Sequence, residues 1–356
     1  MVDAVKRLIK PQIQALSAYH VPNSDGLIKL DAMENPYSWP EQAEAQWRSV
    51  FADPEVNRYP DPSATEVRQA LREAMSIADD LDIVLGNGSD EIIQMILMAV
   101  NGAAGVLVPT PTFVMYEMIA QFFSIPFYGV PLTEDFELDL PAMLAAVKKH
   151  QPDVIFLAYP NNPTGNAFVE ADVNAIIKAA DGLVVIDEAY APFTDVSYLE
   201  TLSQWDNVVV MRTVSKMGLA GLRLGYLVGH PDWIEQFDKV RVPYNINVLT
   251  QKAAVIALSH QSDFDEQAMK IRESRQQLME ALSELPINIF PSETNFLLIR
   301  MADHEQALSV FDGLKQEGIL IKILSRPDTP LVGCLRVTVG SEPENTAFLA
   351  AFKRHF

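Results

Sequence analysis

The stretch that decides the fold is Val154-Ile155-Phe156-Leu157-Ala158, followed directly by Tyr159-Pro160-Asn161-Asn162-Pro163-Thr164-Gly165. Five consecutive apolar residues, three of them bulky, are typical of a strand that is covered on both faces of a sheet. The two prolines and the glycine that follow form a rigid turn, which fixes two asparagine amides. The sequence therefore predicts a buried strand with polar side chains where it ends.

Six further runs of this kind alternate with longer helical patterns. They cover residues 82–85, 105–108, 127–130, 183–186, 208–211 and 226–229. Strands separated by helices indicate βαβ units, so we predict an α/β fold with a mostly parallel seven-stranded sheet and helices on both faces. In such sheets the ligand lies beyond the carboxyl ends of the strands, and the residues after each run are the candidate site.

The length of 356 residues suits a large domain with a smaller one. Beyond residue 230 the pattern changes to α+β. It consists of a helical stretch at 248–285, a strand at 295–299, a helix at 305–316 and strands at 320–323 and 334–339. We predict a large domain over 41–245 and a small domain formed by 1–40 and 246–356. Residues 1–40 are irregular and form an arm that packs on the small domain or on a neighbouring subunit.

The chain is strongly acidic, with 27 Lys and Arg against 47 Asp and Glu, a net charge of −20. Such a chain repels nucleic acid and anionic membranes, so neither is an expected partner. The lone cysteine, Cys334, cannot form an internal disulfide. We expect a cytoplasmic protein with no leader or membrane span. The six histidines lack metal-binding spacing, so no metal is expected.

Two strand ends favour a flat, phosphorylated ligand. After 82–85 comes Gly86-Asn87-Gly88-Ser89-Asp90-Glu91, where glycines and a helix start form an anion cup, or else an ordinary turn. After 105–108 comes Phe113, which could stack on a flat ring, although a phenylalanine in the core or at a rim is commoner.

Two more strand ends carry reactive groups. Asp187 begins the segment Asp187-Glu188-Ala189-Tyr190 at the end of a buried strand, where an acid is costly unless it has a partner. The partner could be a protonated ring nitrogen or a metal, or Asp187 could cap the start of a helix. The segment from Arg212 to Arg223 holds hydroxyls, glycines and Lys216, which suit a phosphate and a reactive amine. A lone Ser-Lys pair is more often a surface loop. Together, however, these strand ends supply the donors, acid, ring and lysine that one cofactor requires.

With these motifs in this order, the chain resembles the fold-type I, pyridoxal-phosphate-dependent aminotransferases over nearly its whole length. The markers are Asn162-Pro163-Thr164-Gly165, Asp187-Glu188-Ala189-Tyr190, and Ser215-Lys216 followed by Gly221-Leu222-Arg223. Within that superfamily the chain is most similar to the histidinol-phosphate aminotransferase family. The stretches that carry this similarity are 18–19, 30–37, 57–61, 291–296 and 335–340.

The resemblance implies that pyridoxal 5′-phosphate is the cofactor. Lys216 would bond its aldehyde and move the proton between Cα and C4′, and Asp187 would pair with the pyridinium nitrogen. Tyr190 and Asn162 would hydrogen-bond the phenolate oxygen, and Phe113 would stack on the ring. The residues implied to hold the phosphate are Gly88, Ser89, Asp90, Thr213, Ser215 and Arg223.

The resemblance also implies substrate contacts and a homodimer. Arg336 resembles the family's anion-binding arginine, and Tyr19 and Asn35 would line the same pocket. Lys322 stands where the family often has arginine; it keeps the charge and loses the two-pronged geometry. Tyr59 would reach the cofactor phosphate of the other subunit.

The implied reaction is a ping-pong amino transfer between histidinol phosphate and 2-oxoglutarate. It gives imidazole-acetol phosphate and glutamate and belongs to histidine biosynthesis. Two alternatives use the same scaffold: an aromatic amino-acid aminotransferase and a lyase similar to threonine-phosphate decarboxylase. A third, a catalytically silent ligand-binding protein, is disfavoured because Lys216, Asp187 and Tyr190 are all retained.

Overall fold

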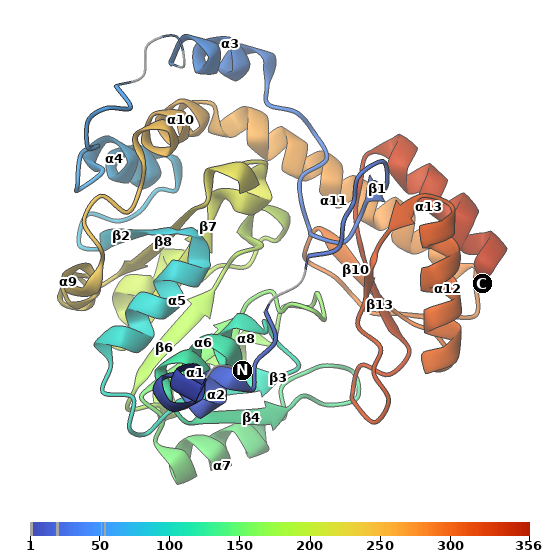
Figure 1. Ribbon diagram of the computed structural model, residues 1–356, viewed down its shortest axis with the longest axis horizontal. Coiled ribbons are helices and arrows are strands. Elements are labelled where there is room, and N and C mark those ends of the chain that lie inside the picture. Colours follow the sequence, from blue (N-terminus) through green and yellow to red (C-terminus); the bar gives the residue numbers. More distant parts are fainter. Residues whose placement is uncertain (1–2, 19–20, 51, 53–54) are drawn as a thin grey trace.

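A seven-stranded sheet forms the centre of the structure, a computed structural model that describes residues 3–18, 21–50, 52 and 55–356 (Figure 1). The strand order is β2-β8-β7-β6-β5-β3-β4. β8 is antiparallel to both of its neighbours, and the remaining adjacent pairs are parallel. The strands are β2 (Asp82–Asn87), β3 (Val106–Thr110), β4 (Phe127–Pro131), β5 (Val154–Ala158), β6 (Leu183–Asp187), β7 (Val208–Thr213) and β8 (Leu224–Gly229). The predicted sheet is confirmed, with seven strands and a mostly parallel arrangement.

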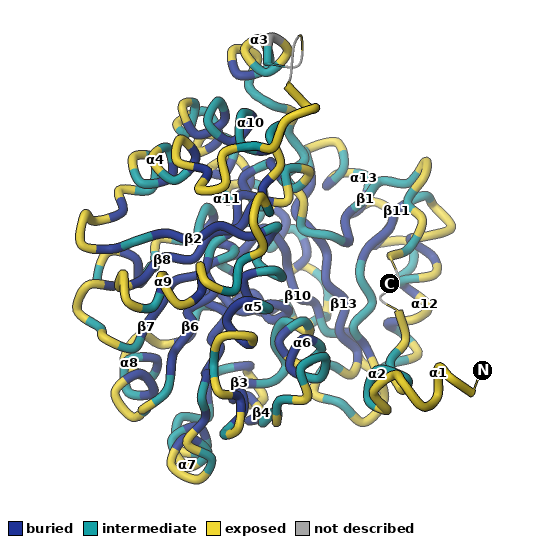
Figure 2. Tube along the Cα trace, turned by 60° about the vertical axis from the view of Figure 1, so that its left-hand side comes forward, coloured by how far each residue is buried: buried dark blue, intermediate teal, exposed yellow. Residues whose placement is uncertain are grey.

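Helices cover both faces of this sheet, as predicted, because its strands are apolar on consecutive positions. In β5, Ile155 and Leu157 belong to one hydrophobic cluster, and Val154, Phe156 and Ala158 belong to the other. The first cluster includes side chains of α4 (Thr65–Ala74), α7 (Leu140–His150) and α8 (Glu170–Ala179). The second includes side chains of α5 (Gly88–Ala99), α6 (Met115–Phe123) and α9 (Pro231–Val240). Figure 2 shows the strands as the buried interior between exposed helix surfaces.

A smaller antiparallel sheet lies beside the large one, in the order β12-β13-β10-β9. Its strands are β9 (Asn288–Ile289), β10 (Phe296–Arg300), β12 (Lys322–Ile323) and β13 (Cys334–Thr338). A third hydrophobic cluster joins it to α11 (Gln261–Ser283), α12 (His304–Gln316) and α13 (Glu342–His355).

Two elements of the C-terminal part differ from the sequence prediction. The helical stretch predicted at 248–285 is divided into α10 (Val248–Ser259) and α11, because His260 leaves the helical conformation with φ −113° and ψ 30°. The strand predicted at 320–323 is two short strands. β11 (Ile319–Leu320) pairs with β1 (Ile28–Lys29), whereas β12 pairs with β13, so the chain changes partners at Ile321.

The N-terminal segment contains more regular structure than the sequence indicates. It forms α1 (Asp3–Leu8), α2 (Pro11–Gln14) and β1, and α3 (Glu41–Val50) follows. Lys10 Nζ donates to the carbonyl of Phe122 in α6 at 3.0 Å, and β1 runs parallel to β11. α10 packs on α3 and α4 and adds Ala254 and Ala257 to a cluster of the large sheet. The domain boundaries at 40/41 and 245/246 stay predictions.

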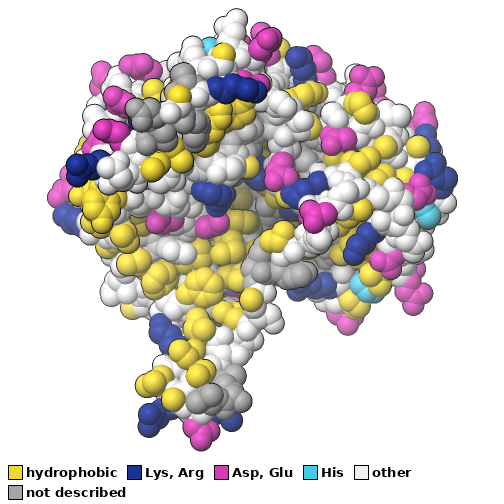
Figure 3. Space-filling view, turned by 45° about the horizontal axis from the view of Figure 1, so that its top comes forward, with side chains coloured by type: hydrophobic (Ala, Val, Ile, Leu, Met, Phe, Trp, Pro, Cys, Tyr) yellow, Lys and Arg dark blue, Asp and Glu magenta, His cyan; other side chains and the backbone are white. Residues whose placement is uncertain are grey.

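Acidic side chains are spread over the face of the molecule shown in Figure 3, in keeping with the net charge of −20. Within the described ranges, no helix combines the length and the apolar character that a bilayer crossing requires.

Candidate active site

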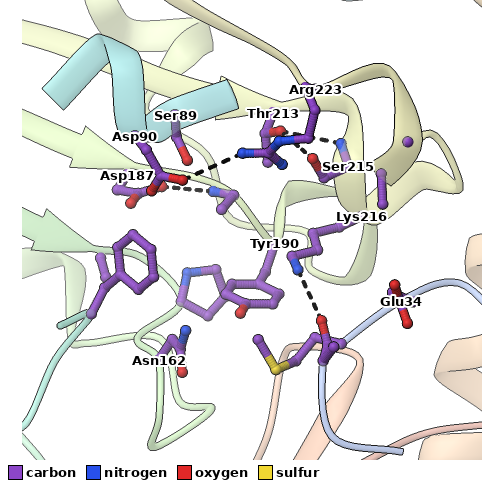
Figure 4. A pocket seen from close by; sticks show the side chains of 18 residues that line it. Glu34, Ser89, Asp90, Asn162, Asp187, Tyr190, Thr213, Ser215, Lys216 and Arg223 are labelled. Carbon is purple, nitrogen blue, oxygen red and sulfur yellow. Dashed lines mark hydrogen bonds and ion pairs between the residues drawn. The ribbon is translucent and has the colours of Figure 1, made fainter. Parts of the chain in front are cut away.

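A cavity of about 430 Å³ opens at the carboxyl ends of the central strands, where α5 and β8 begin (Figure 4). The structure brings together here most of the residues that the sequence proposed for the cofactor. They are Ser89, Asp90, Phe113, Asn162, Asp187, Tyr190, Thr213, Ser215, Lys216 and Arg223. The N-terminal segment closes one side with Ala32, Met33 and Glu34. The individual role of each residue stays a prediction.

Lys216 follows β7 in the short 3-10 helix Val214–Met217, which aims its side chain into the cavity (Figure 4). Its Nζ donates to the carbonyl of Ala32 at 3.4 Å and lies 5.8 Å from the ring centroid of Tyr190. Burial of the ammonium lowers the pKa of Lys216 to about 8, and the charge of Arg336 acts in the same direction. A substantial fraction of this lysine is therefore a neutral amine at mildly alkaline pH.

Asp187 is the last residue of β6 and is 5% exposed. Burial raises the pKa of its carboxyl to about 6, which still leaves it mostly ionised at neutral pH. Two hydrogen bonds oppose that rise: Ala189 N–H donates to Oδ1 at 3.0 Å, and the Tyr116 hydroxyl donates to Oδ2 at 2.5 Å.

Tyr116 is the contact that sequence reasoning missed. It lies in α6, far along the chain from Asp187. In the sequence it comes three positions after Phe113, and its pattern indicates only a core residue. The available signal was its hydroxyl, because a buried tyrosine needs a hydrogen-bond partner.

The segment predicted to form an anion cup lies at the start of α5, where backbone N–H groups have no partner within the helix. Gly88 has φ 76°, and a side chain there would collide with the guanidinium of Arg223. Arg223 Nη2 lies 3.3 Å from Asp90 Oδ2. Burial raises the pKa of Asp90, and its Oδ1 is buried without a hydrogen-bond partner. Gly88, Asp90 and Arg223 therefore surround a compact space at the start of α5, and Arg223 supplies its positive charge.

The hydroxyls of Thr213 and Ser215 stand at the same end of β7. Ser215 N–H donates to Thr213 Oγ1 at 3.2 Å, which fixes the turn that carries Lys216. Both side chains line the cavity.

A second cavity of about 580 Å³ continues from the first and shares Met33, Phe113 and Asn162 with it. It carries three cationic side chains, Lys322, Arg326 and Arg336, and no carboxylate among its described lining residues. Lys322 on β12 is the register partner of Arg336 on β13.

Arg336 connects the second cavity to the first. Its Nη1 donates to Asn162 Oδ1 at 2.5 Å, and its Nη2 donates to the carbonyl of Asp31 at 3.1 Å. The guanidinium also lies over the ring of Phe296, at 5.2 Å from the centroid. Arg336 is 8% exposed, so the position of its charge is fixed by packing.

Of the predicted residues that the structure describes, Asn35, Tyr59 and Gly88 line neither cavity, although Gly88 packs against Arg223, which lines the first. Tyr19 lies outside the described residues. Asn35 lines neither cavity; its Nδ2 donates to the carbonyl of Met217 at 2.8 Å and to Gln267 Oε1 at 3.0 Å. Tyr59 is 80% exposed and stacks on Tyr244 with a centroid separation of 4.4 Å.

One buried ion pair stands behind the site. Glu188, whose side chain is fully buried, accepts from Arg212 Nη2 at 2.6 Å and joins the ends of β6 and β7. Of the residues that the structure places, no three His, Cys, Asp or Glu gather as a metal-binding group.

This fold is that of an aminotransferase. Residues 25–352 match the family model described as aminotransferase class I and II. The chain therefore belongs to the aminotransferase class I and II family.

The names of the individual relatives are more specific than the description of the family model. Histidinol-phosphate aminotransferase 2 of Nitrosococcus oceani is 51% identical, over 99% of this chain and 98% of its own length. Histidinol-phosphate aminotransferase 2 of Cupriavidus pinatubonensis is 49% identical, over 98% and 96%. The crystal structure of histidinol-phosphate aminotransferase from Sinorhizobium meliloti in complex with pyridoxal-5′-phosphate has a TM-score of 0.87 and 25% identity, covering 98% of this chain and 97% of that one. The resemblance stated from the sequence is confirmed.

Proposed function

We propose that this protein uses pyridoxal 5′-phosphate to transfer the amino group of histidinol phosphate to 2-oxoglutarate, in histidine biosynthesis. The products are imidazole-acetol phosphate and glutamate. The observation that carries the proposal is a single cavity that holds the amine of Lys216, the carboxylate of Asp187 and the cation of Arg223 at a helix start. The names of the full-length relatives support the choice of substrate.

The cavity suits this cofactor chemically. The helix start and Arg223 match a phosphate, and the cradle at Gly88 has no room for a side chain. The partly exposed Phe113 offers an aromatic face, and Asp187 offers a buried charge. When bound, the cofactor supplies an aldehyde that bonds to amines and a ring that withdraws electrons from Cα.

Residues of the chain itself would transfer and hold the protons in this reaction. Lys216 is poised to take the proton from the substrate Cα because its lowered pKa, about 8, supplies a neutral amine near working pH. Asp187, which is mostly ionised at neutral pH, would hold the ring nitrogen of the cofactor and keep it protonated. Burial raises the pKa of Tyr190, so its hydroxyl stays protonated and can donate a hydrogen bond. Asn162 is oriented by Arg336.

The second cavity favours a substrate with a phosphate. Lys322, Arg326 and Arg336 line it without a described carboxylate, although the whole chain has a net charge of −20. A phosphate at the far end of the substrate matches this charge, whereas the far end of phenylalanine is neutral. The same cations serve a carboxylate of 2-oxoglutarate in the second half of the reaction.

The lyase alternative has weaker support. L-threonine-O-3-phosphate decarboxylase from Porphyromonas gingivalis shares the fold, with a TM-score of 0.78 and 23% identity. A likeness at that level concerns the fold alone. A lyase would release carbon dioxide without requiring 2-oxoglutarate.

A homodimer and a cytoplasmic location belong to the same proposal. Tyr59 is exposed and does not line the cavity of its own chain, which supports a role at the cofactor phosphate of a second subunit. Figure 3 shows hydrophobic side chains gathered at the lower centre of one face, where a second subunit could pack.

The decisive test compares amino donors. Purified protein with added cofactor is assayed for kcat/KM with histidinol phosphate, phenylalanine and tyrosine, each with 2-oxoglutarate as acceptor. We expect a clear preference for histidinol phosphate. A preference for the amino acids would leave the family assignment and remove the substrate, and turnover without 2-oxoglutarate would favour the lyase.

A further inference from the structure

We infer that Tyr116 is a positioning residue for the cofactor: its hydroxyl keeps Asp187 ionised and aimed into the cavity, so that cofactor binding survives mild acid. This inference rests on the proposed cofactor. Tyr116 does not line the cavity, and it acts through Asp187 and Phe113, which do.

Packing fixes the ring of Tyr116. The residue is fully buried in α6, and its ring stacks on Phe156 with centroids 4.7 Å apart and planes 12° apart. Its ring meets Phe113 edge-on, at 5.5 Å and 86°. Because the ring is buried and packed against two other rings, the direction of its hydroxyl bond to Asp187 Oδ2 is set by the core.

Asp187 needs this hydrogen bond because its other surroundings favour the neutral acid. Burial raises the pKa of Asp187, and the nearby charges of Asp90 on α5 and of Glu188 add to the rise. Tyr190, also buried, is a further titratable group in the same surroundings. Tyr116 and the N–H of Ala189 act in the opposite direction. Among the described side chains, Tyr116 is the one that donates a hydrogen bond to this carboxylate.

One residue thus supports two predicted contacts with a flat ring. Phe113 would meet the face of the ring and Asp187 its nitrogen, and both touch Tyr116. A protonated Asp187 carries no negative charge, so it cannot stabilise a proton on the ring nitrogen. The hydroxyl of Tyr116 therefore sets the pH below which the cofactor is held weakly.

The direction of the effect follows from the hydrogen bond. A donor to the ionised form of an acid lowers its pKa, so Tyr116→Phe raises the pKa of Asp187 above its value of about 6. The acid side of the binding profile must then move toward neutral pH. A purely structural loss would weaken binding equally at every pH.

The experiment measures the dissociation constant of pyridoxal 5′-phosphate by equilibrium dialysis between about pH 5 and about pH 8.5, a range that spans the titration of Asp187. Tyr116→Phe keeps the ring and removes the hydroxyl. The matched control is Tyr198→Phe, since the Tyr198 hydroxyl donates to Asn174 Oδ1 at 2.9 Å, away from the cavity. Circular dichroism and Tm establish that both variants are folded.

We expect wild type and Tyr198→Phe to lose affinity together as the pH falls through about 6. Tyr116→Phe should lose affinity about one pH unit higher, with roughly twofold weaker binding at neutral pH, roughly tenfold weaker binding at about pH 5 and near-normal binding at the alkaline end. An unchanged midpoint, or a loss that is the same at every pH, would overturn the inference. Failure of wild type to bind the cofactor at all would instead overturn the proposed function.

Discussion

The guanidinium of Arg223 packs against the Cα of Gly88, so that a methyl group at residue 88 would overlap Nη2 and stand 3.0 Å from Cζ. Gly88 also adopts φ 76°, a conformation that side chains disfavour. We expect Gly88→Ala to displace Arg223 and to weaken binding of pyridoxal 5′-phosphate about tenfold. The strained backbone should lower the free energy of unfolding by about 1 kcal/mol. Dialysis and urea unfolding measure the two effects.

Gly318→Ala is the control that separates the backbone strain at positive φ from the steric contact with Arg223. Gly318 has φ 82°, but a side chain there meets no atom within 4 Å. This variant should lose similar stability and keep its cofactor affinity. If both variants bind the cofactor like wild type, Arg223 is not part of the phosphate site.

Capture of the cofactor by apo-protein should depend on the charge of Lys216. The amine must lose its proton before it can attack an aldehyde, so the capture rate should rise with pH to a plateau, with a midpoint near the pKa of about 8. Glu34→Gln should move this midpoint down, because the charge of Glu34 raises the pKa of Lys216. Stopped-flow absorbance measures the rate. A midpoint near the ordinary value of 10.5 would show that burial does not tune this lysine.

Lys216→Ala should abolish the visible absorbance of the bound cofactor and lower turnover about a thousandfold or more. The loss should appear with every amino donor, because the proposed role of the lysine is at Cα and not at the far end of the substrate. Full turnover in this variant would refute the proposed chemistry.

The cations of the second cavity should discriminate between donors. Lys322→Met and Arg326→Met should each lower kcat/KM for histidinol phosphate about tenfold to a hundredfold, the range for a lost charged hydrogen bond. Turnover of phenylalanine should change little, since its far end is neutral. Lys315→Met, on the exposed side of α12, is the control for the loss of a positive charge. Equal losses with both donors would mean that these cations do not recognise the phosphate of the substrate.

The buried pair of Glu188 and Arg212 should matter for stability. Arg212→Met leaves a fully buried carboxylate without its cation, which should lower the free energy of unfolding by about 3–5 kcal/mol. Arg272→Met breaks a pair with Asp195, whose side chain is 83% exposed, and should cost about 1 kcal/mol or less. Urea unfolding of the two variants tests the contrast; similar losses would show that Glu188 is solvated or finds another partner.

The subunit arrangement can be tested with two defective chains. If Tyr59 serves the partner's site, then Tyr59→Ala and Lys216→Ala homodimers are both impaired, and mixed dimers contain one intact site. Random re-association should then restore about a quarter of wild-type activity. Activity that stays at the average of the two separate variants would place Tyr59 outside the active site.

The seven strands of the large sheet were predictable because each carries its own signal. Val154–Ala158 is buried on both faces, so nearly every residue is apolar and the run stands out locally. The rule that ligands lie beyond the strand ends then points to Asp187 and Lys216 without any knowledge of contacts.

Long-range pairings could not be predicted, because the signals in the sequence are local. The bond between Tyr116 and Asp187 joins residues 71 positions apart, and neither residue's neighbours indicate the other. The change of partner at Ile321 depends on β1, nearly 300 positions earlier in the chain and only two residues long. Local patterns reveal burial and reactive groups, but they do not reveal which buried groups meet.

The pairing of β1 with β11 also sets when the pocket is completed during synthesis. The wall formed by Ala32, Met33 and Glu34 follows β1, which is held by Leu320 through the amide of Leu30 and by Thr338 through the amide of Met33. On the ribosome these partners emerge last, when the rest of the pocket has already been translated. A chain that ends before these strands would therefore lack the partners that hold one wall of the proposed cofactor site, and we expect it to retain the cofactor less tightly.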